Sequence, residues 1–543
     1  MRTTALLLAA ATALAGCSMD PRLARPEPPV SPSWPVGDAY LRQSEAALPT
    51  ITYRDVFRDR RLQAIIAQAV ANNRDLRVAV ANIRSARALY RIQRADRFPQ
   101  IDATGRYQYS NGGGGTTVTG VNNGTGTGGT GTGTGTGGTG TGGTGGSTNP
   151  GGVGGNTGTV TGGGGGSFFQ ANLGVTAFEI DLFGRVASLT RAAQQRYFAQ
   201  EAAARATRLI LVGDIAQAWL TYAADLSLLR VAERTAQSAE SSVRLTRARL
   251  EGGIVPRSDL TQAQQVLATA QRDLAEQRTF VAQDVNALTL LVGASVDPTL
   301  LPASIEEAAP TLAVLPAGLD SRVLLRRPDV VQAEYELRAT NAEIGAARAA
   351  LFPRISLTGI LGFASNSLGS LFNGDNFNYS VSPTASYSIF RAGAGRANVE
   401  FSRAQRDAAL AGYERAIQIA FREVADALAR QGTIAEQLRA SQLLLNATDE
   451  TLRLNEARYR GGIDTFLTLL DAQRSAYTAQ RTFVATQLAA GTNRVALYRA
   501  LGGDATLETT AAGPVPVSAS GAPRADEPLP VLPPVPERPS RRP

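Results

Sequence analysis

One stretch without proline decides the fold: Gly395–Tyr459, which reads GRANVEFSRAQRDAALAGYERAIQIAFREVADALARQGTIAEQLRASQLLLNATDETLRLNEARY. Nearly all of its residues are good helix formers. Positions spaced alternately by three and four form a mostly apolar seam, made of Ile417, Ala420, Val424, Ala427, Gln431, Ile434, Leu438, Ser441, Leu445, Thr448 and Leu452. A helix of roughly 65 residues is about 95–100 Å long, too long for a globular domain to bury. The stretch therefore predicts a coiled coil, a helical barrel or a fibre.

The composition excludes several classes of function. The 543 residues carry a net charge of +8, but the arginines are spread among acidic residues along the helices, so no nucleic-acid partner is expected. There is no histidine and only one cysteine, which excludes the usual His/Cys metal sites. We expect no cofactor and no enzymatic activity.

The N-terminus reads as a bacterial export signal. Arg2 precedes an apolar run, and Leu14-Ala15-Gly16-Cys17 resembles the lipobox of bacterial lipoproteins. The alternative is an ordinary signal peptide with a chance cysteine, but a lone free cysteine is unusual in an exported protein. We expect acylation of Cys17, with palmitate among the lipids, and Ser18 at the next position fits passage to the outer membrane. One acylated terminus anchors a chain without spanning the bilayer.

Period-two alternation predicts four strands, at about 100–109, 168–180, 354–363 and 377–389. The first has an apolar face from Ile101 to Tyr109, and the second an apolar face from Phe169 to Ala177. Serine, threonine and asparagine dominate several of the opposite faces. Since no later stretch is apolar over about 18–20 residues, any membrane crossing must be made by strands.

The chain is internally duplicated. Phe98-Pro99 matches Phe352-Pro353, and Arg249–Ile254 matches Arg458–Ile463 at an offset of 209 residues that continues to Gly293 and Gly502. The predicted division is a signal peptide (1–16), a lipidated tether (17–50), a first repeat (51–293), an equatorial connector (294–319), a second repeat (320–503) and a disordered Pro-rich tail (504–543). Long helices are expected at 184–250 and 395–459, and a flexible Gly/Thr loop at 111–166.

Four strands cannot close a barrel, and open sheet edges are not tolerated in lipid. Two chains would supply eight strands, whose interior fills with side chains, whereas three would supply twelve around a water-filled lumen. We therefore expect a trimer whose polar strand faces line a lumen and whose apolar faces contact lipid. The long helices must then lie in the periplasm.

The residues also resemble a known family, the TolC-type outer-membrane factors of tripartite efflux systems, in particular the lipoprotein branch that includes OprM and NodT. The resemblance covers nearly the whole mature chain, and it rests on Asp181–Arg185, Arg327–Asp329, Ile344–Arg348, Phe352–Leu357, Arg458–Gly462 and Leu469–Arg474. It implies an all-α dominated membrane protein with a transmembrane β-barrel, in which a trimer forms twelve strands above a twelve-helix periplasmic α-barrel. It further implies a periplasmic adaptor (membrane fusion) protein and an inner-membrane pump, expected to be of the RND type.

The resemblance places the functional site where the long helices end. It implies an apolar constriction at Leu467, an acidic ring at Asp471, and interhelical links involving Tyr459, Asp259 and Arg474. Asp464 stands where some relatives have arginine, which weakens that link. In the alternative interpretation Asp259 and Asp464 are helix N-caps and Leu467 is a seam residue. A separate hypothesis is that Gly252, Gly253, Gly461 and Gly462, beside Arg249 and Arg458, let adaptor hairpins approach the backbone.

The predicted function is therefore the passive exit duct of an efflux pump for drugs or other small toxic compounds. A type I protein secretion duct is the alternative within the channel class. A structural or adhesive coiled-coil lipoprotein would explain the long helices, but neither the strands nor the duplication.

Overall fold

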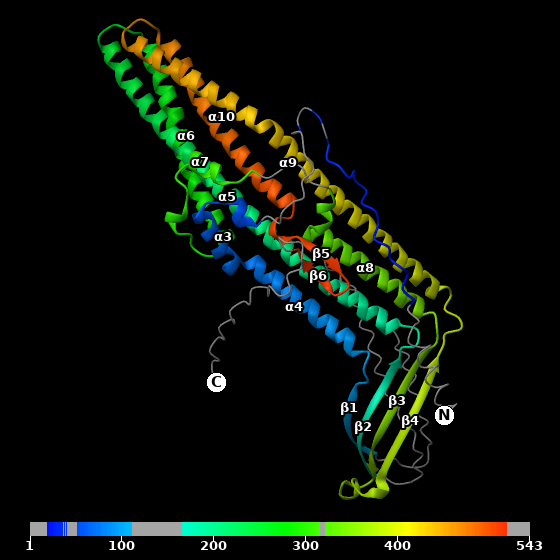
Figure 1. Ribbon diagram of the computed structural model, residues 1–543. Helices are drawn as coiled ribbons and strands as arrows, with labels where there is room; N and C mark the ends of the chain where they lie inside the picture. Colours follow the sequence, from blue (N-terminus) through cyan, green and yellow to red (C-terminus); the bar gives the residue numbers. More distant parts are fainter. Residues whose placement is uncertain are drawn as a thin grey trace. The chain divides into compact units, whose positions relative to one another are not determined.

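The computed structural model describes residues 19–35, 37, 40, 52–110, 166–314 and 321–517. The predicted signal peptide, Cys17, nearly all of the Gly/Thr tract and the end of the tail lie outside these residues. The chain divides into two compact units (Figure 1). The sheet unit contains Ala95–Phe183 and Ala350–Ala392, and the helical unit contains most of the remainder.

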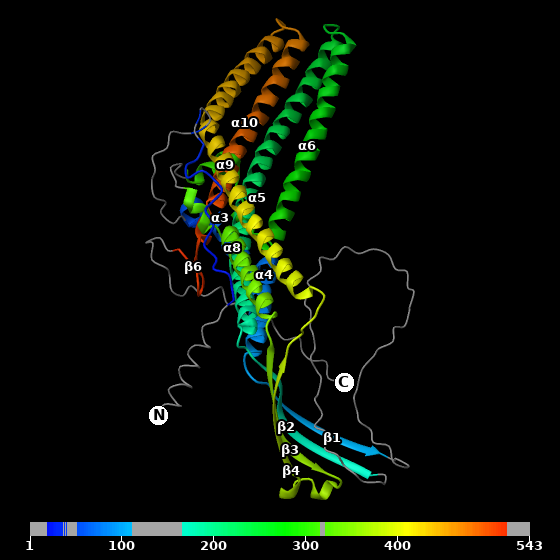
Figure 2. The same cartoon turned by 90° about the vertical axis from the view of Figure 1, so that its right-hand side faces the viewer.

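The sheet unit holds four antiparallel strands in chain order (Figure 2): β1 (Ile101–Ser110), β2 (Gly166–Ile180), β3 (Arg354–Ser365) and β4 (Phe377–Ser386). Their register sets apolar residues opposite one another. Ala103 pairs with Leu173, Leu173 with Leu361, and Leu361 with Tyr379. Such cross-strand pairs stabilise a sheet by about 0.2–1 kcal/mol each. The result is one continuous apolar face.

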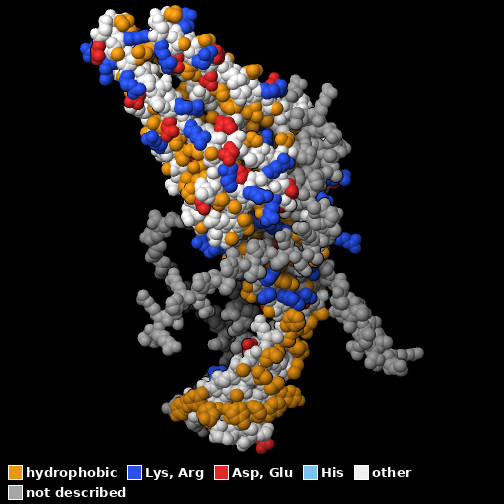
Figure 3. All heavy atoms as spheres, turned by 60° about the vertical axis from the view of Figure 1, so that its left-hand side comes forward, with side chains coloured by type: hydrophobic (Ala, Val, Ile, Leu, Met, Phe, Trp, Pro, Cys, Tyr) orange, Lys and Arg blue, Asp and Glu red, His pale blue; other side chains and the backbone are white. Residues whose placement is uncertain are grey.

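That apolar face is exposed in the single chain. Figure 3 shows hydrophobic side chains gathered over the strands, and the exposed fraction is 60% for Tyr107, 77% for Tyr379 and 67% for Val381. Among the described residues, β1 pairs only with β2 and β4 only with β3, so each leaves one edge without a strand partner.

The prediction for the second strand was wrong at Ala177. The register between β2 and β3 shifts between Val175 and Phe178, and Ala177 adopts a positive φ of 51° in this bulge. A bulge inserts one residue and reverses the alternation beyond it. Phe178 and Ile180, not Ala177, therefore continue the apolar face, opposite Leu357 and Ile355.

The helical unit is built on two helices of 67 residues each, α5 (Arg185–Glu251) and α9 (Ala394–Arg460). Each is followed by a shorter helix, α6 (Arg257–Val292) and α10 (Phe466–Ala500). Figure 1 shows the turns of the two hairpins at the same end of this unit. Helix α8 (Pro328–Ala349) packs against both α5 and α9, and α10 packs against both α9 and α5.

The predicted seam on α9 faces its neighbours. Ile417, Ala420, Val424, Ala427 and Ser441 are buried, and the other seam positions are half-buried. Next to the seam, Leu443 is 70% exposed. The spacing of three and four therefore identified the packed side of α9 over 417–452.

The first helical stretch is divided in two, where the sequence predicted one helix. After the short α2 (Tyr53–Val56), α3 (Arg60–Asn72) ends at Asn73 and α4 (Arg74–Ala95) begins there. The Asn73 side chain accepts a hydrogen bond from Leu76 N at 3.0 Å and donates one to Leu291 O at 2.8 Å. Asparagine is among the preferred residues at a helix start because it satisfies an otherwise unpaired N–H group.

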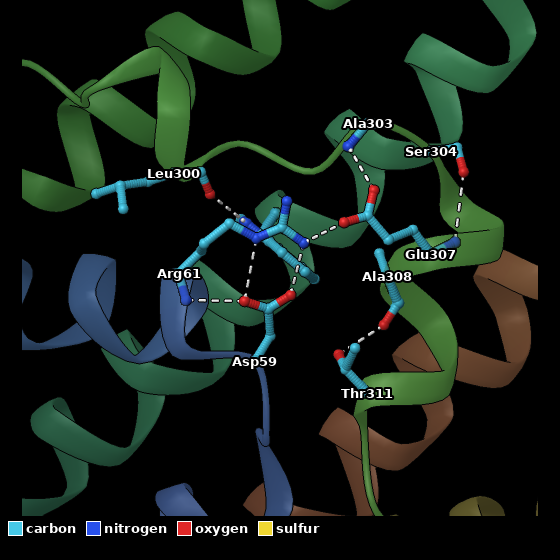
Figure 4. Close-up of polar contacts among 9 residues, drawn as sticks. Asp59, Arg61, Leu300, Ala303, Ser304, Glu307, Ala308 and Thr311 are labelled. Carbon is cyan, nitrogen blue, oxygen red and sulfur yellow. Dashed lines mark hydrogen bonds and ion pairs between the residues drawn. The ribbon is translucent and has the colours of Figure 1, made fainter.

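The connector between the repeats is short and tied to α3. It contains the 3₁₀ turns η1 (Pro298–Leu300) and η2 (Ala309–Thr311) and the single-turn helix α7 (Ile305–Ala308), with η3 (Ser321–Arg326) before α8. Figure 4 shows Arg61 of α3 lying between Asp59 and Glu307. This guanidinium joins the start of α3 to α7.

Glu334 of α8 joins both ends of the described chain. It is 2% exposed and accepts hydrogen bonds from Arg25 at 2.8 Å, Arg338 at 2.7 Å and Thr509 at 3.0 Å. Arg25 lies in the extended N-terminal segment and Thr509 beyond α10. Because a buried carboxylate needs hydrogen-bond donors in place of water, Glu334 holds both segments to α8.

The predicted disorder after Gly502 was wrong for the first residues of the tail. They form the turn η6 (Gly503–Ala505) and a hairpin of β5 (Leu507–Thr510) and β6 (Gly513–Pro516). Leu507 is fully buried, and Tyr335 donates a hydrogen bond to Thr510 O at 3.0 Å. Four-residue strands carry little periodicity, so their stability comes from contacts with α5 and α8 that the local sequence does not show.

Among the described residues, α5 alone is long and apolar enough by composition to cross a membrane. Of the apolar window, 56% is buried, as in the core helix of a packed bundle.

Two half-buried acidic residues, Asp225 of α5 and Asp284 of α6, lie together at the α5–α6 interface. Burial, followed by the nearby negative charge of Asp225, raises the pKa of Asp284 to about 7. Burial also raises the pKa of Asp225. Oδ2 of Asp284 is buried without a hydrogen-bond partner among the described residues, while Tyr222 and Arg230 lie nearby. The two helices therefore pack best when this pair carries a proton.

Stability should fall as the pH rises. The pKa of Asp284 is higher in the folded than in the unfolded chain, so its stabilising contribution is complete below about pH 4 and is lost as the pH passes about 7. We expect a lower Tm at pH 8 than at pH 5.5 by circular dichroism. Asp284→Asn should reduce this difference, and an unchanged difference in that variant would contradict the assignment.

Candidate functional site

The two hairpin turns have the same backbone geometry. Ile254 N donates to Arg249 O at 2.8 Å and Gly253 N to Leu250 O at 2.9 Å. In the second turn Ile463 N donates to Arg458 O at 2.9 Å and Gly462 N to Tyr459 O at 3.0 Å. This pair of bonds is the Schellman motif, which satisfies the last carbonyl groups of a helix. The tip, defined here as 243–263 and 452–474, contains both turns.

The four glycines at the tip have two different roles. Gly253 and Gly462 have φ of +71° and +74°, a conformation that favours glycine. Gly252 and Gly461 have φ of −78° and −74°, and a Cβ there would meet its nearest atom at 3.5 Å, an ordinary contact. The backbone conformation explains only the first pair. At Gly252 and Gly461 the backbone does not require glycine, so what glycine provides there is a surface without a side chain next to the turn.

An apolar cluster supports the turns from within the chain. Its buried members are Val243, Ala263, Tyr459, Phe466 and Leu469. The rings of Tyr459 and Phe466 lie 5.7 Å apart, and Tyr459 is 2% exposed. The Tyr459 hydroxyl lies 3.3 Å from Oγ1 of the buried Thr246. The cluster joins α5 and α6 to α9 and α10.

Arg249 completes this junction. Its Nη2 donates to the carbonyl oxygens of Tyr459 at 2.8 Å and Arg460 at 3.1 Å, and its guanidinium lies 4.5 Å from the centre of the Tyr459 ring. A cation at a helix C-terminus is stabilised by the unpaired carbonyl groups and by the helix dipole. An arginine from the first repeat thus caps the long helix of the second.

The equivalent residue of the second repeat has a different partner. Arg458 donates to both carboxylate oxygens of Asp464, at 2.6 and 3.1 Å. These hydrogen bonds lower the pKa of Asp464 below its ordinary value. The Arg458 side chain is 53% exposed. The acidic residue at 464 thus holds an arginine of its own hairpin.

The predicted gate residues lie on three helices: Asp259 and Leu467 in the first turns of α6 and α10, Asp471 and Arg474 further along α10, and Tyr459 in the last turn of α9. Leu467 is 59% exposed, and the Asp471 side chain is 62% exposed and lies 3.8 Å from Arg474. Asp259 accepts a hydrogen bond from Ser258 at 3.3 Å. Within one described chain Tyr459 bonds Thr246, so Tyr459, Asp259 and Arg474 are not brought together.

The alternative interpretation of these residues was wrong in its details. The N-cap residues are Pro256 for α6 and Thr465 for α10, and the Thr465 side chain accepts a bond from Thr468 N at 3.3 Å. Asp259 and Asp464 are therefore not N-caps. Leu467 is too exposed to be a packed seam residue in the single chain.

Sequence reasoning missed Thr246 and Phe466. Tertiary packing places both residues. Phe466 could have been noticed as an aromatic residue directly after the helix N-cap Thr465, whereas Thr246 is recognised only by its position opposite the Tyr459 hydroxyl. Among the described residues, no group of three or more Cys, Asp or Glu side chains is arranged to hold a metal ion. The tip offers exposed apolar and acidic side chains around two rigid turns.

Comparison with known proteins yields a family match. The model of the family described as outer membrane efflux protein matches residues 65–294 and 319–503. The toluene efflux pump outer membrane protein TtgC of Pseudomonas putida is 41% identical over 505 residues, covering 92% of this chain and 96% of that protein. Outer membrane protein OprJ of Pseudomonas aeruginosa is 38% identical over 510 residues, covering 92% and 95%.

Solved structures of similar sequence have the same fold. The open state of the MtrE outer membrane channel of Neisseria gonorrhoeae superposes with a TM-score of 0.72 at 31% identity, covering 90% of this chain and 98% of that one. CusC superposes with a TM-score of 0.72 at 32% identity, covering 90% and 100%.

Replacing Arg249 should loosen the tip. Arg249→Ala removes two charge-assisted hydrogen bonds and a cation–π contact, together worth about 1–3 kcal/mol. Amide hydrogen exchange within 455–466 should accelerate about tenfold or more. Arg453→Ala is the matched control because Arg453 forms only an exposed pair with Glu450 on α9. Equal exchange in the two variants would contradict the capping role.

Proposed function

This chain belongs to the outer membrane efflux protein family, and we propose that its copies close into the exit duct of a tripartite efflux pump. It is an outer-membrane efflux protein, as its relatives are. The observation that supports a duct is the sheet: in the described chain, β1 and β4 each have an edge without a strand partner, and one face is apolar and exposed. The relatives favour efflux over type I protein secretion and over an adhesive role.

Closure requires more than one copy. Each unpaired N–H or C=O group would cost several kcal/mol in hydrocarbon, so β4 of one copy must pair with β1 of the next. Three copies of the four-stranded sheet supply twelve strands, wide enough for a water-filled lumen. The apolar face then contacts lipid, and Tyr107 and Tyr379 lie at the membrane surface, where aromatic residues are enriched.

The helical unit supports the same assembly. Helices α4 and α8 occupy equivalent places in the two repeats and both have 22 residues. Helix α8 packs between α5 and α9 and buries residues along its length, whereas α4 buries only Ile83. Val78, Leu89 and Ile92 of α4 are 58–63% exposed. The α9 helix of a second copy would cover them, as α5 of the other repeat covers α8.

We propose Leu467 and Asp471 as the constriction. Both side chains belong to the tip and are exposed in the single chain, so three copies would present three of each toward the axis. In the same assembly, Asp259 and Arg474 would form links between copies beside the Tyr459 that is buried within each chain. Apolar and acidic rings are common selectivity elements in pores.

The tip is also the proposed adaptor-docking surface. Ile254 and Ile463 are 73% and 68% exposed next to the open backbone of Gly252 and Gly461. Exposed isoleucines flanked by glycine offer an apolar contact with room for a partner backbone. The partners would be a periplasmic adaptor and an inner-membrane pump of the RND type.

Acylated Cys17 would anchor each copy to the outer membrane. The residues just beyond it are held: Met19 O accepts a bond from Arg348 at 3.2 Å, and Asp20 accepts one from Ser188 at 2.7 Å. A Cβ on Gly345 would lie 1.8 Å from Asp20 Oδ1, so this glycine makes room for the tether. Because relatives are named for toluene, solvents and antibiotics, we propose small toxic compounds as substrates.

Removing the constriction should widen the duct. Leu467→Ala and Asp471→Ala should each raise single-channel conductance of the purified protein in planar bilayers, about twofold or more for a constriction that dominates the resistance. Leu443→Ala, an exposed leucine away from the tip, is the control. Conductance unchanged in both tip variants would remove these residues from the gate.

Adaptor docking is best tested at the two glycines with ordinary φ. Gly252→Leu and Gly461→Leu add bulk without backbone strain, so cross-linking to the adaptor should fall strongly while the oligomer persists. Gly412→Leu, on α9 with no atom within 4 Å of its Cβ position, is the matched control. Full cross-linking in both tip variants would exclude close backbone approach.

A further inference from the structure

We propose that Arg458 binds the C-terminal carbonyl groups of α5 in a neighbouring copy of this chain. The inference rests on the closed assembly proposed above, because it requires a second copy next to the α9–α10 hairpin. It identifies the residue that joins two copies at the tip, and the oxygens that it binds.

The duplication carries the argument. At the offset of 209 residues, Arg458 corresponds to Arg249, Tyr459 to Leu250, and Arg460 to Glu251. In a closed ring the two kinds of hairpin alternate, so each junction within a chain has an equivalent between chains. Within the chain Arg249 binds the carbonyls of Tyr459 and Arg460. Between chains Arg458 would bind those of Leu250 and Glu251.

The acceptor side suits a cation. Leu250 O already accepts from Gly253 N, just as Tyr459 O accepts from Gly462 N while also binding Arg249. The equivalent oxygen therefore has a lone pair for a second donor. The exposed Glu251 carboxylate adds negative charge at a helix end that already favours cations. In the junction within the chain this position is Arg460, which pairs with Glu456 at 2.6 Å.

Asp464 competes for the same guanidinium. The first repeat has Val255 at the corresponding position, and there Arg249 reaches the other hairpin. In the second repeat Arg458 is held by both oxygens of Asp464. To contact the neighbouring copy, Arg458 must give up or share these bonds. Because an exposed ion pair is worth little, the exchange is possible, but it weakens the contact.

The junction between copies also lacks the aromatic residues of the junction within the chain. Leu250 has neither the ring nor the hydroxyl of Tyr459, and Arg257 stands where the second repeat has Phe466. One polar contact has an equivalent: Gln473 donates to Ser242 at 3.4 Å, and the corresponding pair is Gln264 and Thr451. The tip junction between copies is therefore the weaker one, and it depends on Arg458.

The test compares two cysteine pairs in the full-length assembled protein. Gln264→Cys with Thr451→Cys reports the junction between copies, and Ser242→Cys with Gln473→Cys reports the junction within a chain. A short bismaleimide links each pair, and mass spectrometry of linked peptides gives the rate. The heat-resistant oligomer band is recorded separately as the measure of assembly. Arg458→Ala and Asp464→Val are then introduced into both backgrounds.

We expect Arg458→Ala to slow linkage between copies about threefold or more, and Asp464→Val to accelerate it roughly 1.5- to 5-fold. Neither should change linkage within the chain. If the oligomer is intact and Arg458→Ala leaves the rate of cross-linking between copies unchanged, the proposed contact is wrong, but the proposed duct is not. Equal slowing of both pairs would also overturn it, as a general loosening of the tip. If the parent protein forms no oligomer, both the proposed assembly and the proposed contact are wrong.

Discussion

Unpaired backbone groups at a sheet edge are the constraint on which this structure depends. In the described part of the chain, β1 and β4 each leave one edge without a strand partner, and the apolar face between them is exposed. A lipid bilayer supplies no hydrogen bonds to such edges, so a sheet of this kind must close on further copies of itself. In the assembly proposed above, α5, α6, α9 and α10 of each copy would surround one axis, and the tip would form the narrow end of the duct.

Duplication provides most of what this closure needs. Each repeat contributes two strands, one helix of 67 residues and one hairpin turn with the same Schellman bonds. The two repeats nevertheless differ where they meet. Arg249 caps the other hairpin and lies over the Tyr459 ring, whereas Arg458 is held by Asp464 within its own hairpin. One chain therefore contains a tight junction and half of a looser one, and the difference arises from a few side chains at the tip.

Much of the architecture follows from the sequence because its patterns are long. The seam on α9 extends over many turns, and the paired Gly-Gly turns marked both hairpins to within a residue or two. Local exceptions were not predictable. The bulge at Ala177 reverses a strand face, Asn73 ends one helix and starts another, and Leu507 is buried because α5 and α8 lie beneath it. At the tip the glycines and Arg249 were identified, but the contacts of Tyr459 with Thr246 and of Arg249 with the second hairpin depend on tertiary packing.

The number of chains in the assembled protein tests the central claim most directly. Native mass spectrometry of the detergent-solubilised, lipidated protein measures it without any substitution. The account predicts a single species of three chains, since three sheets of four strands close a lumen that two would fill. A stable monomer or dimer that still conducts ions in a bilayer would contradict it, because the edges of β1 and β4 would then have to be satisfied in some other way.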